Sequence, residues 1–372
     1  MSLESRLNQV IDAAISGETI VGAVVLVHQN GRPVYERAAG YADRESGKKT
    51  AKDTIFRMAS VTKPLVAATA LALVEKGELA LEAPVSDYLP WFRPRLADGA
   101  PAAITIHHLL THTSGLAYDS SLEQLPVEER INQGLLNTDL DFEANFSRVN
   151  RRPLGFAPGA SWMYSYATDI LGAAIAAVTG GTLEAAVVEH VCGPLGMNDT
   201  RFHVTDTDRL ATAYADQRPR PMPMTDPQWL SNDEGASFNF SPSRIFNPSA
   251  FQSGGAGMAG TAVDFIRFLN ALQKGGEPIL SREMTEKGLS NQIGRHLHSP
   301  GVKFGYFGSV TVNPEAAELP VPAGTVTWGG VYGNSWLLDP KNGISLVSYS
   351  NTALEGCTGA FPNDLVKALY AA

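Results

Sequence analysis

The sequence predicts an α+β fold in which one antiparallel sheet is built from both ends of the chain. Strand-like segments occur near the N-terminus and again beyond residue 301, whereas the middle of the chain is mostly helical with Pro- and Gly-rich loops. This distribution favours a sheet flanked by helices, with a helical domain inserted between its two halves. We therefore expect a discontinuous sheet domain, residues 1–85 and 250–372, and a mainly helical inserted domain, residues 86–249.

The N-terminal elements follow from periodicity and turn chemistry. Residues 4–16 carry apolar side chains at helical spacing. Strands are expected at residues 21–27 and 33–41, because Asn30-Gly31 between two apolar runs is a strong signal for a tight hairpin turn. An almost unbroken apolar run at residues 65–74 then predicts a buried helix.

The remaining elements are expected to be mostly helices up to residue 275 and mostly strands beyond residue 301. A long proline-rich segment at residues 216–248 lies between two of the helices. Long irregular segments of this kind often line sites. Helices are expected from residue 105 and at residues 166–178, 181–191, 261–275 and 363–370. Strands are expected at residues 304–312, 325–328, 333–338 and 344–350.

Composition argues against several classes of function. The chain has 372 residues, 44% of them hydrophobic and 18% charged, which is typical of a globular protein with a sizeable core. A net charge of −9 argues against nucleic acid or an anionic membrane as a partner. No apolar run reaches membrane-spanning length and no secretory leader is visible, so we expect a cytoplasmic protein. The two cysteines form no metal-type cluster, and we expect neither a metal nor a cofactor.

Ser60 and Lys63 are the pair that indicates chemistry. They lie three residues apart at the start of the apolar helix, and residues at this spacing share one helical face. A bare serine is a poor nucleophile, and a lysine amine kept neutral by burial can take its proton. Free N–H groups at the helix N-terminus also suit a developing oxyanion. The pair predicts a serine acyl-enzyme; the alternative is a serine helix cap beside a lysine that reaches the solvent.

The spacing alone is not specific, because Ser46 and Lys49 share it. Their segment is polar, crowded with charge and contains Gly47, which predicts a solvated turn. A solvated lysine stays protonated at neutral pH and is no base there. Context therefore selects Ser60 and Lys63.

A serine–lysine site usually needs a third polar group, and Tyr164 is our candidate. It lies between the Pro158-Gly159 turn and an apolar helix, where a side chain can project into a cleft. A phenol can shuttle protons if a neighbouring ammonium lowers its pKa. Tyr332 and Tyr349 are competitors whose strand-like surroundings favour a place in the sheet. A surface position for Tyr164 is the remaining alternative.

Two other motifs are interpreted as structural. Residues 255–260 match Gly-x-Gly-x-x-Gly, but no buried strand precedes them, so a turn followed by a helix cap at Thr261 is favoured over a dinucleotide site. His107, His108 and His112 lack the adjacent glutamate of a zinc hydrolase, which favours core histidines over metal ligands. The sequence has no Gly-x-Ser-x-Gly elbow, which disfavours an α/β-hydrolase.

The order of four motifs resembles that of class C β-lactamase-like serine hydrolases. The motifs are Ser60–Pro64, Leu109–Leu116, Pro158-Gly159 through Tyr164-Ser165, and Gly254–Met258. The resemblance covers residues 21–351 and is strongest to the family VIII carboxylesterases, at Trp162–Ser165 and Trp328–Gly333. It implies a β-lactamase/transpeptidase-like fold and hydrolysis of an ester.

This resemblance implies roles for individual residues. Ser60 would be the nucleophile, and Lys63 and Tyr164 would be the general-base pair, with coupled titrations. The backbone N–H groups of Ser60 and Val331 would form the oxyanion hole. The residues expected to contact the substrate are Trp328, Gly329, Gly330, Tyr118 and Tyr166.

Two departures from the β-lactamases bear on the substrate. Those enzymes carry Tyr-x-Asn and Lys-Thr-Gly where this chain has Tyr164-Ser165-Tyr166 and Trp328-Gly329-Gly330. Their lysine helps to hold a substrate carboxylate, and a hydrogen bond to a charged group contributes roughly 1.5–3 kcal/mol. An indole offers an apolar wall and one donor instead. We therefore expect a neutral small-molecule ester of a short or medium acyl chain rather than an anionic β-lactam.

Other functions remain open at this point. A β-lactamase, a D-amino-acid peptidase or amide hydrolase, or an acyltransferase would use the same fold and the same serine. A non-catalytic binding protein would carry a serine that resists covalent labelling, but the retained Ser60, Lys63 and Tyr164 argue against it. A serine carboxylesterase is the favoured prediction; the oligomeric state is left open.

Overall fold

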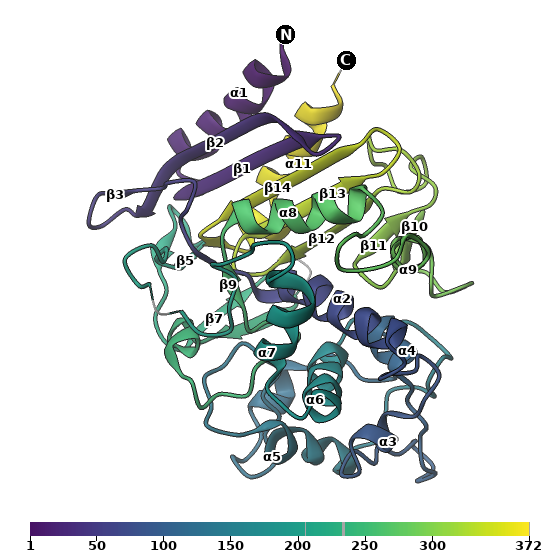
Figure 1. Ribbon diagram of the computed structural model, residues 1–372. Coiled ribbons are helices and arrows are strands. Elements are labelled where there is room, and N and C mark those ends of the chain that lie inside the picture. The colour runs from purple at the N-terminus through teal and green to yellow at the C-terminus, as the bar shows by residue number, and fades with distance from the viewer. Residues whose placement is uncertain (205, 233–234, 372) are drawn as a thin grey trace.

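An eight-stranded antiparallel sheet forms the centre of the computed structural model, which describes residues 1–204, 206–232 and 235–371 (Figure 1). The strand order is β10-β11-β12-β13-β14-β1-β2-β3. The strands are β1 (Gly22–Gln29), β2 (Arg32–Asp43), β3 (Lys48–Lys49), β10 (Val302–Phe304), β11 (Ser309–Thr311), β12 (Val326–Gly330), β13 (Asn334–Asp339) and β14 (Ile344–Ser350).

The two ends of the chain meet inside this sheet. β1 pairs with β14, with Ala23 opposite Ser350, so segments from opposite ends of the sequence lie side by side. β1 also pairs with β2 through a tight turn in which Asn30 and Gly31 have φ values of 52° and 74°. The predicted hairpin and the predicted sheet built from both ends are confirmed.

Helices cover both faces of the sheet (Figure 1). Helices α1 (Leu3–Ser16) and α11 (Ala360–Tyr370) share one core with alternate residues of β1, among them Val25 and Val27. Helices α2 (Thr62–Glu75) and α8 (Ala262–Gln273) share the other core with Val24 and Leu26. β1 is buried on both faces, which explains why it reads as a continuous apolar run rather than an alternating one.

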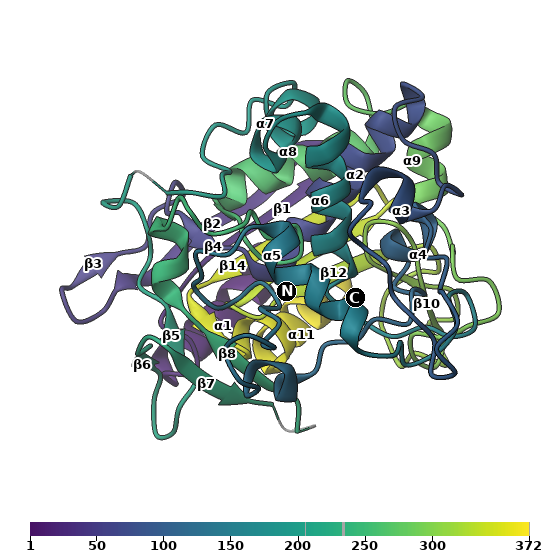
Figure 2. The same cartoon turned by 90° about the horizontal axis from the view of Figure 1, so that it is seen from below.

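The segment between the two halves of the sheet packs against α2 and extends the same core (Figure 2). Its helices are α3 (Val85–Tyr88), α4 (Ile106–Leu110), α5 (Phe142–Phe146), α6 (Ala167–Thr179) and α7 (Leu183–Val187). Short strands follow: β5 (Tyr214–Ala215), β6 (Met222–Pro223), β7 (Gln228–Ser231) and β8 (Ser237–Phe240). The domain boundaries at residues 85 and 249 stay a prediction.

Within the described ranges, no single helix is both long and apolar enough to cross a membrane. Only α6 and the segment Leu183–Cys192 meet the length and composition test together, as a pair bent by 84°. The first nine residues of α6, from Ala167 to Ile175, are buried in the protein core.

The structure differs from expectation in one predicted strand and in several short elements. Residues 304–312 were predicted to form one strand, but the chain turns between β10 and β11, where Gly305 N donates to the Gly308 carbonyl at 2.8 Å. The turn lets Tyr306 and Phe307 enter the core. Further elements were not predicted: helices α3, α5, α9 (Arg282–Leu289) and α10 (Glu355–Thr358), and the short strands β3, β4 (Phe56–Arg57), β5, β6, β7, β8, β9 (Ala259–Gly260) and β15 (Thr352–Ala353).

Candidate active site

Ser60 lies in a short 3₁₀ turn, Ala59–Val61, that leads directly into α2. Ala59 has a φ of 43°, a value uncommon for a residue with a side chain, so the chain bends sharply just before the serine. β12 passes close to this bend, because a Cβ on Gly330 would lie 2.0 Å from the Met58 carbonyl oxygen. Only a residue without a side chain fits at that position.

Lys63 is almost completely buried and is surrounded by three oxygen acceptors. Only 5% of the residue is exposed. Its Nζ lies 3.2 Å from Ser60 Oγ, 3.1 Å from Tyr118 Oη and 2.8 Å from the Gly255 carbonyl oxygen. These contacts match the three donors of an ammonium group.

Tyr164 lies on the other side of the serine, in the loop just before α6. Its hydroxyl donates to Ser60 Oγ at 2.7 Å, and its ring centroid lies 4.8 Å from Lys63 Nζ. The two competing tyrosines have structural surroundings instead. Tyr349 is buried in β14, and Tyr332 packs edge-on against Phe240 with ring centroids 5.0 Å apart. The structure therefore brings Tyr164, rather than its competitors, to Ser60 and Lys63.

The ring of His112 packs against the ring of Tyr164. The two ring centroids are 4.9 Å apart in an edge-on contact, and His112 Nδ1 lies 3.1 Å from Ser165 Oγ. Burial lowers the pKa of His112 well below its usual value, and the nearby charges of Lys63 and His298 act in the same direction. A buried neutral imidazole at this place is a packing and hydrogen-bonding group.

The other two histidines of this motif are also held by local contacts. His107 Nδ1 contacts the Tyr306 hydroxyl at 2.9 Å, and His108 Nδ1 accepts from the Thr105 N–H at 3.1 Å in a helix cap. Over the residues that the structure describes, no group of three or more His, Cys, Asp or Glu side chains could hold a metal ion. His112 is buried, whereas His107 and His108 are half-buried and held by these local hydrogen bonds.

The sequence argument missed Asp169 and the role of the glycine-rich turn. Asp169 is fully buried in the first turn of α6, and its Oδ1 accepts from Ser253 Oγ at 2.5 Å and from Gly255 N at 3.3 Å. Burial raises the pKa of Asp169, whereas the Ser253 hydrogen bond and the charge of Lys63 lower it. Asp169 thus fixes the turn whose Gly255 carbonyl accepts from Lys63. A single acid inside an apolar helix was the available signal.

Ser60 opens into a cavity of about 690 Å³. Five of the sequence-predicted residues line it together with the serine: Tyr118, Tyr164, Trp328, Gly329 and Val331. The proline-rich segment contributes residues 235–239, as its length suggested. Gly330 is not among the lining residues, because it packs beneath Met58. Tyr166 is not among them either; it is 4% exposed and stacks on Phe146.

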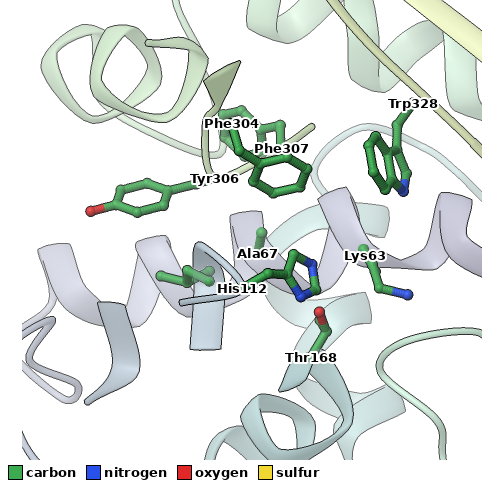
Figure 3. Close-up of a pocket in the computed structure, with 9 residues that line it drawn as sticks. Lys63, Ala67, His112, Thr168, Phe304, Tyr306, Phe307 and Trp328 are labelled. Carbon is green, nitrogen blue, oxygen red and sulfur yellow. The ribbon is translucent and has the colours of Figure 1, made fainter. Parts of the chain in front are cut away.

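A second, much smaller cavity lies behind Lys63 (Figure 3). Phe304, Phe307 and Trp328 form its aromatic side, and His112 and Thr168 lie opposite. Its volume of about 10 Å³ leaves room for at most about one water molecule. The side of Lys63 that faces away from Ser60 is therefore closed by these side chains.

The fold and the arrangement of Ser60, Lys63 and Tyr164 define a class, the serine hydrolases of β-lactamase type. The family model described as Beta-lactamase matches residues 7–368. Because this match covers nearly the whole chain, the protein belongs to the β-lactamase family.

Within this family, the chain is similar to esterases. It is 45% identical to Esterase EstB of Burkholderia gladioli over 376 residues, covering 100% of this chain and 96% of that protein. The solved structure of EstCE1, described as a hydrolase with promiscuous acyltransferase activity, superposes with a TM-score of 0.94 at 38% identity and covers 99% of this chain and 98% of its own. Simvastatin synthase from Aspergillus terreus shares the fold, with a TM-score of 0.76, 21% identity and coverage of 100% and 98%.

Proposed function

We propose that the protein is a serine carboxylesterase that hydrolyses esters of short or medium acyl chains. One observation carries the proposal: Ser60 Oγ accepts hydrogen bonds from both Lys63 and Tyr164 at the wall of the large cavity. The similarity to Esterase EstB over the whole chain supports the same reaction. The substrate in this proposal is a small-molecule ester, and no cofactor takes part.

In the proposed mechanism, Ser60 Oγ attacks the ester carbonyl and its proton passes to the Tyr164–Lys63 pair. The pair returns that proton to the alcohol oxygen as the carbonyl–oxygen bond breaks, which leaves an acyl-enzyme on Ser60. Water then attacks the acyl group, gives one proton to the pair, and the acid leaves as Ser60 recovers its hydrogen. Ser60 Oγ accepts from both Lys63 and Tyr164, so one member of the pair gives up its own proton before the serine proton passes to it.

The oxyanion hole is proposed at the backbone N–H groups of Ser60 and Val331. The close packing of Gly330 under Met58 places the end of β12 next to the 3₁₀ turn that carries the serine. Two N–H donors at the point where negative charge develops contribute more to the transition state than to the bound ester. Gly330→Ala would separate these two backbones and lower the acylation rate.

Trp328 supports an ester rather than an anionic β-lactam as substrate. It lines the cavity beside Tyr164, with ring centroids 5.0 Å apart. In the described part of the cavity wall no lysine or arginine is present to bind a substrate carboxylate. His298 also lines the wall, but burial lowers its pKa and so favours the neutral ring.

Acyl transfer is the second candidate, and the EstCE1 structure favours it because that hydrolase is described as having promiscuous acyltransferase activity. An alcohol or amine bound in the cavity would then replace water in the second step. Hydrolysis of a p-nitrophenyl ester with and without an added alcohol separates the two, since transfer yields a new ester and hydrolysis yields the acid.

Acylation of Ser60 is the direct test of the esterase proposal. Mass spectrometry after brief exposure to a p-nitrophenyl ester should show one acyl group on the peptide that contains Ser60. Full turnover by Ser60→Ala would sink the proposal. If nitrocefin were turned over faster than the ester, the protein would be assigned as a β-lactamase instead.

The cytoplasm is the compartment we propose. Cys192 and Cys357 are both free thiols, which suits a reducing environment and supports this location. Fractionation of cells that produce the protein, with a periplasmic marker enzyme as the control, tests it.

A further inference from the structure

Glu123 is a buried acid in the wall of the cavity that contains Ser60. It ends the 3₁₀ turn Ser120–Glu123, five residues after Tyr118, and only 9% of the residue is exposed. Its charge raises the pKa of Tyr118, although less than burial, Tyr164 and Asp169 do. The carboxyl therefore lies within electrostatic reach of the groups around Lys63. The proposed mechanism gives it no part.

The surroundings of Glu123 provide little compensation for a negative charge. Within the described chain its side-chain hydrogen bond comes from Gln133 Nε2, at 3.5 Å, the outer limit for such a bond, and the backbone of Gln133 is the other hydrogen-bonding group that lowers its pKa. Gln133 Nε2 also donates to the Asp119 carbonyl at the shorter distance of 2.9 Å. Arg130 is the nearby cation, but its Nε donates to the Leu125 carbonyl and forms no ion pair with Glu123 in the described residues. A buried carboxylate without a close partner is costly.

The rest of the wall has the chemistry of a cation site. The aromatic side chains that line the cavity are Tyr118, Trp162, Tyr164, Phe238 and Trp328. Aromatic faces attract ammonium groups, most strongly where water is excluded. The second acid of the wall is Asp119, which is exposed. A ligand with a positive charge would meet both aromatic faces and an acid for which the described wall supplies no cation.

We propose that this cavity takes esters that carry an ammonium group and that Glu123 supplies the counter-charge. The inference rests on the proposed esterase function and adds a substrate class to it. A neutral ester of the same shape fills the same space but leaves the carboxylate of Glu123 uncompensated. An anionic ester is opposed by both Glu123 and Asp119.

The preference for a cation should depend on pH in a defined direction. Burial raises the pKa of Glu123 to about 7, and the hydrogen bond from Gln133 and the charge of Arg130 oppose this rise. The charged or titratable groups that face it are Asp119, Tyr118 and Arg130. The carboxyl is neutral below this pKa and charged above it. The preference should therefore grow as the pH rises through about 7.

The test uses matched pairs of esters that differ in one charge. Butyrylcholine and 3,3-dimethylbutyl butyrate place a cation or an isosteric neutral group on the alcohol. The p-nitrophenyl esters of 4-(trimethylammonio)butyric acid and 5,5-dimethylhexanoic acid do the same on the acyl side. For at least one pair, kcat/KM should favour the cationic ester roughly tenfold at about pH 8.5, a value that corresponds to about 1.4 kcal/mol. The ratio should fall clearly at about pH 6, where most Glu123 is protonated and only the aromatic faces and Asp119 still favour the cation.

Glu123→Gln removes the charge and keeps the shape, and Glu128→Gln is the matched control in the same loop. Glu128 is exposed and does not line the described cavity. The ratio is read within each variant, so that a loss of folded enzyme cancels. We expect Glu123→Gln to lower the preference at high pH to the value that the wild type shows at low pH, and Glu128→Gln to retain it. Equal ratios in the wild type and Glu123→Gln at both pH values would overturn the inference.

A measurement on the wild type alone covers the case in which Glu123→Gln does not fold. Tetramethylammonium should inhibit turnover of a neutral ester more strongly at about pH 8.5 than at about pH 6, and tert-butyl alcohol should show no such change. Inhibition that does not change with pH counts against Glu123. If no ester is turned over and Ser60 is not acylated, the esterase proposal itself has failed. Turnover without any charge preference removes only the substrate class.

Discussion

Two regions of this chain share the Ser-x-x-Lys spacing and differ in everything around it. Ser46 lies in the exposed turn between β2 and β3, and Lys49 is exposed at the end of β3. Ser46 Oγ lies 3.5 Å from the Asp43 carbonyl oxygen, and Lys49 Nζ lies 3.6 Å from the Tyr41 ring centroid. Ser60 and Lys63 are bonded to each other, and Lys63 is 5% exposed. Burial and a direct hydrogen bond between serine and lysine, rather than spacing, therefore distinguish the Ser60 pair from the surface pair.

The largest effect should come from the serines themselves. Ser60→Ala removes the proposed nucleophile and should lower kcat/KM for a p-nitrophenyl ester by about 10⁴-fold or more, as in other serine hydrolases. Ser46→Ala is the matched control and should leave the rate unchanged, since Ser46 is exposed. Steady-state kinetics on both variants decide it. A comparable loss of kcat/KM in the two variants would contradict the assignment of Ser60, rather than Ser46, as the nucleophile.

The lysines provide the next comparison. Lys63→Met keeps the length of the side chain but removes the contacts to Ser60, Tyr118 and Gly255, and kcat should fall by about 10³-fold. Lys49→Met should have no effect on kcat, because Lys49 is exposed on β3. Thermal unfolding of both variants separates a catalytic loss from a folding loss. Near-normal turnover by folded Lys63→Met would contradict the proposed relay.

Tyr164 is the third residue of the proposed site, and no tyrosine hydroxyl contacts Ser46 in the described residues. Tyr164→Phe removes the 2.7 Å hydrogen bond to Ser60 and should lower kcat about 10²-fold. Tyr349→Phe is the matched control; the Tyr349 hydroxyl is buried and has no hydrogen-bond partner in the described structure. That variant should keep wild-type turnover. Equal turnover in Tyr164→Phe and the wild type would assign the proton transfer to Lys63 alone.

The smallest predicted effect concerns the wall beside the serine. Trp328→Ala removes an aromatic face that touches Tyr164 and should raise KM roughly tenfold, because apolar contact with the ester is lost. The control is Trp229→Ala, at a tryptophan that is 42% exposed and does not line the described cavity. Initial rates over a range of ester concentrations give both constants. An unchanged KM in Trp328→Ala would remove the argument from Trp328 for an ester over an anionic β-lactam.

Local sequence signals were enough to find the residues that touch the serine. Ser60 and Lys63 were set apart by the apolar helix that follows them, and Tyr164 by its position before α6. The hairpin at Asn30-Gly31 needed only turn chemistry. Each of these features depends on a few neighbouring residues, which a sequence displays directly.

The parts that could not be predicted depend on residues far apart in the chain. Asp169 matters because α6 packs next to the turn that contains Gly255, and Glu123 because its loop returns to the serine. Asp169 is the one acid in the apolar helix α6, but the residues next to these two acids do not show which distant groups they contact. Tyr166 was expected at the substrate, but packing of its ring on Phe146 decides its position. The break between β10 and β11 likewise serves the core, since it buries Phe307.

The pairing of β1 with β14 also has a consequence for synthesis of the protein. Ser60 and Lys63 leave the ribosome early, but Trp328 and Val331 follow only when most of the chain has been made. The sheet closes later still, when Ser350 reaches its position opposite Ala23. Contacts of such long sequence separation form late. We therefore expect nascent chains to carry the serine without the wall and backbone donors that would make it reactive, and to stay inert toward esters until translation ends.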